Sequence, residues 1–390
     1  MRLTRATALT SVASAVLAAS LTGCNLTTDS APAGPIVIGA DLELSGSAAA
    51  VGKAFERALR LKTEQLNAAG VAGGRKLELR VRDNRSDSRQ SLKNLGEFGD
   101  DSTVAAVITG SCSQCLIAAH RTVESKKLPT IALAPATDVT TPVAERQHIF
   151  KIAPNAVDSA AALAGHLEEL KAKKVALLLN DDPYAKDGEA AMRAELTKAQ
   201  IDVVAAPAVK VTDTDLSGAV RTAITDKPDA LVVWTFAEQA ALAASAAKAQ
   251  NFEGDLLFDA GAADDLFLAE PAATAAEGVM MVFTQTMVID DVIATTPTKA
   301  ARKQWFRDYT SRYGSYSGHA SFAADALQLL ADGLDRVGGV DRDRLREVVE
   351  TSQLDGLSGP IRMTPDNHSG LMPQALTMLV VRGGRWRLAA

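Results

Sequence analysis

The chain has 390 residues, of which 47% are hydrophobic, 23% charged and 4% aromatic, and its formal net charge is −6. This length and apolar content are enough for two domains with buried cores. A mildly acidic chain without a block of like charges lacks the basic face that nucleic-acid phosphates require. We therefore expect no nucleic-acid partner.

The first 23 residues are predicted to be a secretion signal. A basic start precedes an uncharged Ala/Val/Leu-rich core over residues 6–20, and small residues at 21–23 form a cleavage site. The sequence LTGC resembles a bacterial lipobox, which predicts that Cys24 is lipidated and anchors the chain to the cell membrane. Residues 24–35 are typical of a flexible tether. A plain secretion signal with an unrelated cysteine is the alternative.

Short apolar strands alternate with helices from residue 36 onward. The predicted strands lie within 36–46, 76–84, 103–110, 128–134, 173–182, 201–211, 228–236 and 254–262. The C-terminal third adds helices over 299–314, 320–338 and 341–352, and a hairpin over 376–389 with a Gly-Gly turn. Strand–helix alternation predicts parallel sheets covered by helices on both faces, repeated in two modules.

The run GSCSQC at 110–115 lies where a buried strand ends and a helix begins. Ser111 is expected to cap that helix with Gln114, and Thr235 with Glu238 repeats the pattern in the second module. Parallel sheets bind ligands beyond the carboxyl ends of their strands, and a helix N-terminus suits a carboxylate. GSCSQC is therefore predicted to line a ligand cleft. A helix cap without any role in binding is the alternative.

Cys112 and Cys115 raise the alternative of a thiol–disulfide oxidoreductase, because a Cys-x-x-Cys pair at a helix N-terminus has a lowered thiol pKa. The motif lacks the preceding Trp expected there, so a local disulfide or two small buried thiols are favoured. A zinc site needs four ligands, and the five histidines are scattered. Phosphate-loop, dinucleotide, nucleophile-elbow and metalloprotease motifs do not occur. We expect no enzyme, no cofactor and no metal.

Ordered segments of the chain resemble the extracellular substrate-binding proteins of branched-chain amino acid ABC transporters, of the leucine/isoleucine/valine-binding type. These segments are IGADLELSGSAAAVGKAFERALRLKTEQLNAAG, the Asp83-Asn84 strand end, ITGSCSQC, LPTIALAPATDVTTPVAERQHIFKIAPN and LLLNDDPYAKDGEAA. The resemblance covers residues 36–390. It implies the type I periplasmic-binding-protein fold, an α/β fold of two Rossmann-like lobes with parallel sheets joined by a three-stranded hinge. Lobe 1 is expected at 36–154 plus 285–357, and lobe 2 at 155–284 plus 358–390.

The resemblance also implies ligand-binding positions. Those that hold the ligand's carboxylate and ammonium, the next strand end, and the two lobe-2 aromatics correspond to Ser111, Cys112, Ser113, Ala134, Ala136, Thr137, Tyr184 and Phe236. The family's acidic partner for the ammonium falls near Ala260, with Asp259 one position earlier, and Glu43 replaces a usual Pro. An ammonium without a carboxylate partner is costly in a closed cleft. Either Asp259 or Glu43 replaces that charge, or the ligand is an amide or another small polar solute.

The expected function is that of a lipid-anchored solute-binding protein. It captures a small polar solute, an amino acid or a related amide, and delivers it to the permease subunits of an ABC transporter. A ligand-sensing receptor is the alternative within the same fold. The oxidoreductase using Cys112 and Cys115 is the less favoured third hypothesis.

Overall fold

Two separate β-sheets organise the described part of the chain. The computed structural model describes residues 34–70, 74–264 and 273–389. The predicted secretion signal, Cys24 and nearly all of the predicted tether lie outside these residues. Within them, no helix combines the length and the apolar character needed to cross a membrane.

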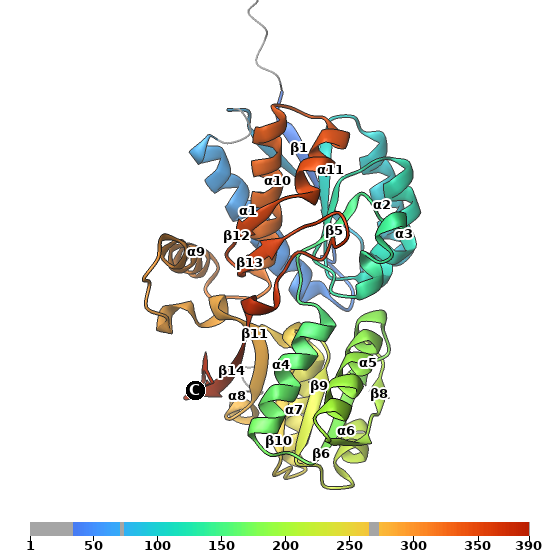
Figure 1. Ribbon diagram of the computed structural model, residues 1–390, viewed down its shortest axis with the longest axis vertical. Coiled ribbons are helices and arrows are strands. Elements are labelled where there is room, and N and C mark those ends of the chain that lie inside the picture. The colour runs from blue at the N-terminus through green and yellow to red at the C-terminus, as the bar shows by residue number, and fades with distance from the viewer. Residues whose placement is uncertain (1–33, 71–73, 265–272, 390) are drawn as a thin grey trace, which may run out of the picture. The chain divides into compact units, whose positions relative to one another are not determined.

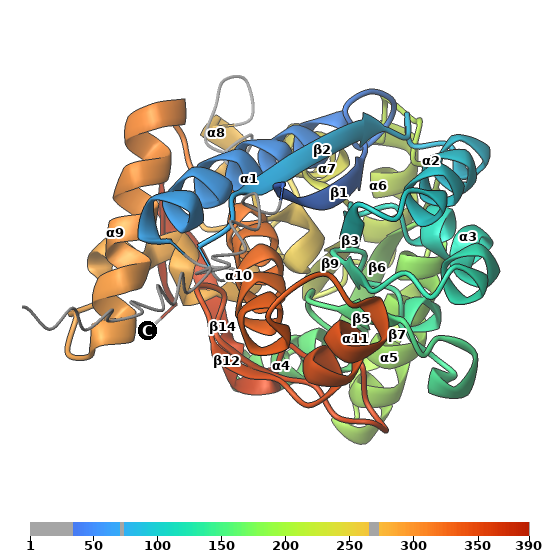
Figure 2. The same cartoon turned by 90° about the horizontal axis from the view of Figure 1, so that it is seen from above.

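The first sheet is five-stranded and parallel, in the order β2-β1-β3-β4-β5. Its strands are β1 (Ile36–Leu42), β2 (Leu77–Asp83), β3 (Val104–Thr109), β4 (Thr130–Ala132) and β5 (Ile149–Lys151). Its covering helices are α1 (Ala49–Ala69), α2 (Ser88–Asp100), α3 (Ser113–Ser125) and α10 (Ala320–Val337). Figures 1 and 2 show α1 and α10 side by side, with α2 and α3 together elsewhere on this sheet.

Alternation along β1 explains the two layers of helices. Ile36, Ile38 and Ala40 belong to the same apolar cluster as residues of α1 and α10, whereas Val37 joins the cluster that contains residues of α2 and α3. Successive side chains of a strand point to opposite faces. A strand that is apolar at every position is therefore buried on both sides, as the sequence predicts for a parallel sheet.

The second sheet follows the path β15-β14-β11-β10-β9-β6-β7, with β8 pairing beside β6. Its parallel strands are β6 (Lys174–Asn180), β7 (Asp202–Ala205), β8 (Ala208–Val209), β9 (Ala230–Trp234), β10 (Asp255–Phe258) and β11 (Met280–Thr284). The antiparallel hairpin comprises β14 (Leu376–Arg382) and β15 (Arg385–Leu388), which confirms the predicted Gly-Gly turn. The covering helices are α4 (Ala156–Glu169), α5 (Pro183–Lys198), α6 (Ser217–Ile224) and α7 (Ala237–Ala249). Alternate β6 residues again join two different apolar clusters.

Further described elements lie outside the two sheets and their covering helices. They are α8 (Ala273–Ala276), η5 (Gln285–Asp291), α9 (Pro297–Tyr313), α11 (Arg342–Glu350), β12 (Gln353–Asp355) and β13 (Pro360–Arg362). The chain leaves the first sheet after β5, returns after β11, and joins the second sheet again at β14. Each sheet with its covering helices can therefore form one lobe, with the crossing segments as the connection between the lobes.

Contacts near residues 358 and 369 hold the segment before the last crossing against the first sheet and α10. The backbone N–H groups of Leu357 and Ser358 donate to the carboxylate of Asp325 in α10. Ser369 forms a parallel bridge with Lys151 at the end of β5. The lobe boundaries stated above stay a proposal, and these contacts favour placing the last crossing after residue 371.

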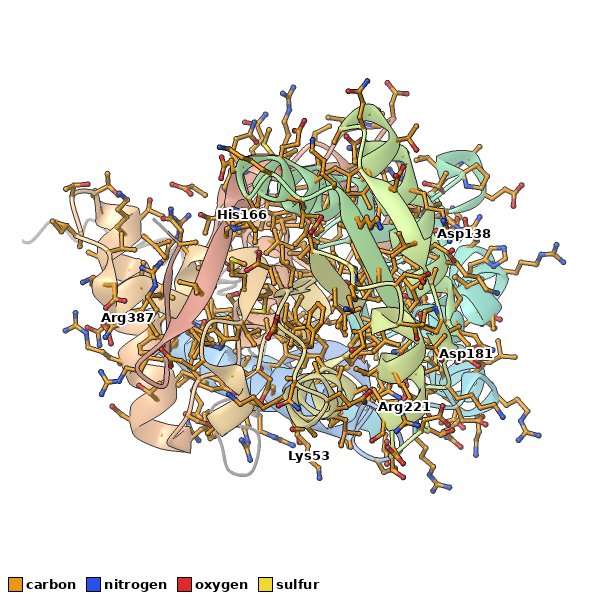
Figure 3. All side chains as sticks on the ribbon, turned by 90° about the horizontal axis from the view of Figure 1, so that it is seen from below. Lys53, Asp138, His166, Asp181, Arg221 and Arg387 are labelled. Carbon is orange, nitrogen blue, oxygen red and sulfur yellow. A yellow bond between two sulfur atoms is a disulfide. The ribbon has the colours of Figure 1, made fainter. Side chains whose placement is uncertain are left out.

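Charged side chains lie mainly at the surface. Lys53, Asp138 and Asp181 are exposed and project from the periphery in Figure 3. A few carboxylates are instead buried, and several of these lie at the carboxyl ends of strands, next to the site described below.

Candidate functional site

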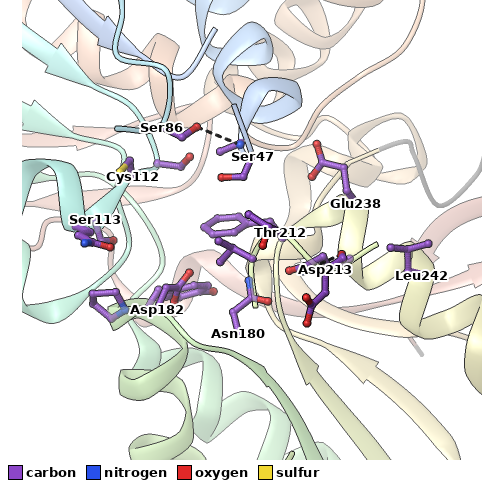
Figure 4. Close-up of a pocket in the computed structure, with 18 of the residues that line it drawn as sticks. Ser47, Ser86, Cys112, Ser113, Asn180, Asp182, Thr212, Asp213, Glu238 and Leu242 are labelled. Atoms are coloured by element: carbon purple, nitrogen blue, oxygen red, sulfur yellow. Dashed lines mark hydrogen bonds between the residues drawn. The ribbon is translucent and has the colours of Figure 1, made fainter. Parts of the chain in front are cut away.

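A cavity of about 430 Å³ lies between the carboxyl ends of strands from both sheets. On one side it is lined by Ser86 and by residues of segments 47–48 and 111–114, which follow strands of the first sheet. Residues from 180–184, 211–214 and 236–242, which follow β6, β8 and β9, line the other side. Figure 4 shows Ser47, Ser86 and Cys112 facing Asn180, Asp182 and Asp213 across this cavity.

The N-terminus of α3 differs from the predicted capping box. The helix begins at Ser113, and Cys112 occupies the N-cap position, where its Sγ accepts the N–H of Cys115 at 3.2 Å. Cys112 and Cys115 form a disulfide in the structure. Ser111 lies one residue too early to cap the helix. The prediction of Ser111 as the cap is therefore wrong.

The second predicted capping box is also wrong. Helix α7 begins at Ala237, and Phe236 occupies the N-cap position without a side-chain hydrogen bond to the helix. The N–H of Thr235 donates instead to Asp259 Oδ1 at 3.2 Å. In both modules, one further residue of loop separates the strand end from the helix, and that extra residue displaces the polar side chain from the cap.

Glu43 occupies the anion-binding position at the start of α3. Its side chain is fully buried, and its carboxylate accepts the N–H of Ser111 at 2.9 Å, the N–H of Cys112 at 3.2 Å and an amide N–H of Asn84 at 3.0 Å. The Oγ of Ser111 donates to the same carboxylate at 3.2 Å. Burial raises the pKa of Glu43 above its usual value, and these hydrogen bonds oppose the increase. Two of the N–H groups predicted to hold a ligand's carboxylate, those of Ser111 and Cys112, are therefore already occupied.

Two glycines make room for Glu43. A Cβ on Gly110 would lie 2.1 Å from Glu43 Oε2, and a Cβ on Gly52 would lie 2.1 Å from the backbone oxygen of Glu43. Both distances are far below van der Waals contact. Only glycine at these two positions leaves enough room for the backbone and the carboxylate of Glu43.

Tyr184 and Phe236 form an aromatic wall of the cavity. Both rings line it, their centroids are 5.7 Å apart, and their planes are inclined by 35°. Tyr184 is only 3% exposed and lies in the first turn of α5. Its ring also contacts Trp234, with centroids 5.7 Å apart.

Asp259 lies behind this wall and not in the cavity. Its fully buried carboxylate accepts the hydroxyl of Tyr184 and the N–H groups of Thr235 and Gly261, the latter at 2.8 Å. Burial raises the pKa of Asp259 well above its usual range. Asp259 lines neither the large cavity nor a smaller one beside it. Its contacts hold the hydroxyl of Tyr184, and its role in ligand binding stays a prediction.

The other positions implied by the resemblance lie in or near the first-sheet side of the cavity. Ser113 lines the cavity, and its Oγ accepts the N–H of Ala136 at 3.2 Å. Ala134 and Ala136 are buried, and the N–H of Thr137 donates to Asp187 of α5 at 2.6 Å. None of these last three lines a cavity named here.

A smaller cavity of about 20 Å³ adjoins the aromatic wall. Ala260, Ser111 and His319 line it together with Tyr184 and Phe236. This volume is about that of a single water. Ala260 therefore borders a space too small for a solute.

Several polar residues of the large cavity are not predicted from the sequence as ligand contacts. Among them are Asn180, Asp182, Asp213 and Glu238. The sequence did contain a signal for them, because Asn180 and Asp182 lie at the end of a predicted strand and Glu238 stands three residues after Thr235. Neighbouring Asp residues near a strand end are usually solvated turn formers. Asp181 is exposed as expected, whereas Asp182 is half-buried and lines the cavity.

Burial affects the charge state of two of these carboxylates. It raises the pKa of Asp182 above 3.8, and the neighbouring Asp181 and Asp187 act in the same direction. It also raises the pKa of Glu238, which the nearby N–H of Ala50 opposes. No group of three or more His, Cys, Asp and Glu side chains that could hold a metal ion occurs among the described residues.

Comparison with known proteins assigns the family. The model of the family described as periplasmic binding protein matches residues 35–385. The chain belongs to this family. The periplasmic binding proteins bind solutes and are not enzymes, and membership implies an extracytoplasmic location. The family therefore agrees with the expectation of a binding protein.

A curated amino acid binding protein of Pseudomonas aeruginosa is 30% identical over 168 residues, which are 42% of this chain and 44% of that protein. The chain thus matches less than half the length of this relative.

Solved structures of periplasmic binding proteins share the fold. An extracellular ligand-binding receptor from Rhodopseudomonas palustris HaA2 gives a TM-score of 0.82 at 22% identity, covering 91% of this chain and 99% of that one. The branched-chain amino acid transporter substrate binding protein LivJ from Streptococcus pneumoniae, in complex with isoleucine, gives 0.79 at 22% identity, covering 90% and 97%. These likenesses confirm the predicted type I fold with its two parallel-sheet lobes.

Proposed function

We propose that this periplasmic binding protein captures a small polar solute in the cavity between its two sheets and delivers it to the permease subunits of an ABC transporter. The main support for this proposal is the position and size of the cavity. It lies at the carboxyl ends of parallel strands, where such sheets bind ligands. Its volume of about 430 Å³ is in the range of small-molecule sites.

The crossings between the sheets support a hinged mechanism. A solute that contacts residues of both lobes stabilises the closed arrangement more than the open one, and so shifts the population towards closure. Ser113 on one side and Tyr184 and Phe236 on the other are the proposed contacts from the two lobes. The sequence LTGC supports a lipid anchor on Cys24, which would hold the protein beside a membrane-bound permease.

The solute class has to come from this cavity, because the solved neighbours are too distant in sequence to transfer a ligand. The prediction of an amino acid or a related amide remains a prediction. The proposed contacts with Ala134, Ala136 and Thr137 require a local rearrangement, since these residues do not border the cavity.

A thermal-shift screen tests capture. Amino acids, amides, amines and small organic acids are each added to purified protein, and a true ligand raises the melting temperature by mass action. Thr212 is exposed and lines the cavity, so Thr212→Trp should obstruct the site and abolish the shift. Thr225 is exposed and lies outside the cavity lining, and Thr225→Trp should keep the shift. A shift that survives Thr212→Trp would place the ligand elsewhere.

A further inference from the structure

The charged side chains that line the large cavity are all acidic. They are Asp182, Asp213 and Glu238, and no Lys, Arg or His is among the lining residues. Asp182 Oδ1 accepts the N–H of Ala185 at 2.8 Å, and Asp213 Oδ2 accepts the N–H of Lys210 at 2.9 Å. A carboxylate has about four acceptor positions, so each keeps capacity for a further donor. The wall of the cavity favours a positively charged occupant.

Asn180 supplies a second and independent indication of a ligand. It is only 3% exposed, it lines the cavity at the end of β6, and neither Nδ2 nor Oδ1 has a hydrogen-bond partner among the described residues. Figure 4 shows this side chain between Asp182 and Asp213. An unsatisfied buried amide is costly, and native proteins rarely leave one without a partner. A polar ligand in the cavity would supply the missing hydrogen-bond partners of Asn180.

Glu43 takes two of the N–H groups that a ligand's carboxylate could use. Glu43 already accepts the N–H groups of Ser111 and Cys112, and its place is kept by Gly52 and Gly110. A carboxylate entering the cavity would have to displace Glu43 or lie near Glu43 and the three acidic side chains of the wall, without a cationic side chain among the lining residues. Either arrangement is unfavourable.

The aromatic wall suits an organic cation better than a metal ion. The carboxylates do not form a metal-binding group in the described chain. Tyr184 and Phe236 line the same cavity as these carboxylates, with ring centroids 5.7 Å apart. A cation over an aromatic face within about 6 Å of its centroid is attracted by the ring. Carboxylates and aromatic faces together recognise an ammonium or guanidinium group attached to a small carbon frame.

We propose that the ligand is a small organic cation, a primary amine or a guanidinium compound, that lacks a carboxylate group. This inference rests on the proposed function and specifies its substrate class. The cationic group lies between the acidic residues and the faces of Tyr184 and Phe236, and Asn180 binds a polar atom of the ligand. Glu43 keeps its hydrogen bonds to the N–H groups of Ser111 and Cys112 before α3.

Matched pairs of probes isolate the effect of the carboxylate. Agmatine and putrescine differ from arginine and ornithine, respectively, by the absence of one carboxylate. Isothermal titration of the purified protein should show saturable binding of at least one of the two amines. The corresponding amino acid should bind at least about tenfold more weakly, which corresponds to about 1.4 kcal/mol. Acetamide and succinate serve as neutral and anionic probes, and neither should bind as tightly as the amine.

Two variants with one control test the acidic wall. Asp182→Asn and Asp213→Asn keep a side-chain acceptor for the backbone N–H, and Asn is also a good N-cap for α5, so both should fold. Each should weaken amine binding by about tenfold or more, because a half-buried charge pair is lost. Asp181→Asn removes the same charge from an exposed neighbour outside the lining, and should change the affinity by less than about threefold, as expected for a screened surface charge.

The possible results separate this inference from the proposed function. Arginine, ornithine, acetamide or succinate binding as tightly as the amines, with loss of binding in Thr212→Trp, would overturn the organic-cation class and leave solute capture intact. Amine binding that is equally affected by Asp181→Asn and Asp182→Asn would overturn the role of the cavity wall. Absence of binding by every probe here and in the thermal-shift screen would overturn both proposals.

Discussion

Tyr184→Phe tests how the aromatic wall is held. The substitution removes the hydroxyl that donates to Asp259 and keeps the ring that contacts Trp234 and Phe236. Asp259 would then retain two backbone N–H donors inside a fully buried site. Removing one partner of a buried hydrogen bond costs about 1–3 kcal/mol, so we expect the free energy of unfolding to fall by about that amount.

Urea unfolding followed by tryptophan fluorescence measures this change, and Tyr313→Phe is the control. The hydroxyl of Tyr313 donates to the backbone oxygen of Arg57 at 3.1 Å in an exposed position, so its loss should cost less than about 1 kcal/mol. A double-mutant cycle with Asp259→Asn should give a coupling energy of at least about 1 kcal/mol, as expected for residues in direct contact. Equal effects of Tyr184→Phe and Tyr313→Phe, with no coupling, would refute the reasoning.

Three further predictions concern other parts of the chain. Burial raises the pKa of Asp41 from 3.8 to about 7, so its contribution to stability is present below about pH 4 and lost as the pH rises through 7. The full pKa difference corresponds to about 4 kcal/mol, of which roughly 2–3 kcal/mol falls between pH 5 and pH 8. The free energy of unfolding should therefore decrease less between these two pH values in Asp41→Asn than in the native chain. Gly110→Ala should destabilise by about 1–3 kcal/mol or more, because its Cβ meets Glu43, whereas Gly165→Ala, with nothing within 4 Å, should not destabilise in urea unfolding. Cys24→Ser should move the protein from the membrane fraction to the soluble extracytoplasmic fraction, and retention in the membrane fraction would contradict the lipid anchor.

Local patterns predict most of the elements. Continuous apolar runs predict the buried strands β3 and β9, and the Gly-Gly step predicts the β14–β15 hairpin. The capping boxes predicted at Ser111 and Thr235 are wrong because each helix begins one residue later than expected, and the N-cap positions are occupied by Cys112 and Phe236. Short-range sequence cannot fix the loop geometry before a helix, since contacts from distant segments, such as Glu43 to Ser111, determine it.

The candidate site is predicted less completely than the fold. The place of the cleft and its aromatic residues Tyr184 and Phe236 follow from strand order and from the family resemblance. The internal roles of Glu43 and Asp259 do not follow, because each depends on partners far away in the chain: 68 residues for Glu43 and Ser111, and 75 for Asp259 and Tyr184. A carboxylate at a strand end looks the same in sequence whether it binds a ligand or a neighbouring backbone.

A crystal structure of the protein grown with the tightest-binding probe, agmatine or putrescine, tests the central claim most directly. We expect density for the probe in the cavity, with its cationic group within hydrogen-bond distance of Asp182 or Asp213 and against Tyr184 or Phe236. The carboxylate of Glu43 should remain on the N–H groups of Ser111 and Cys112. A probe bound outside the cavity, or a cavity that holds only water at saturating probe concentration, would contradict the account.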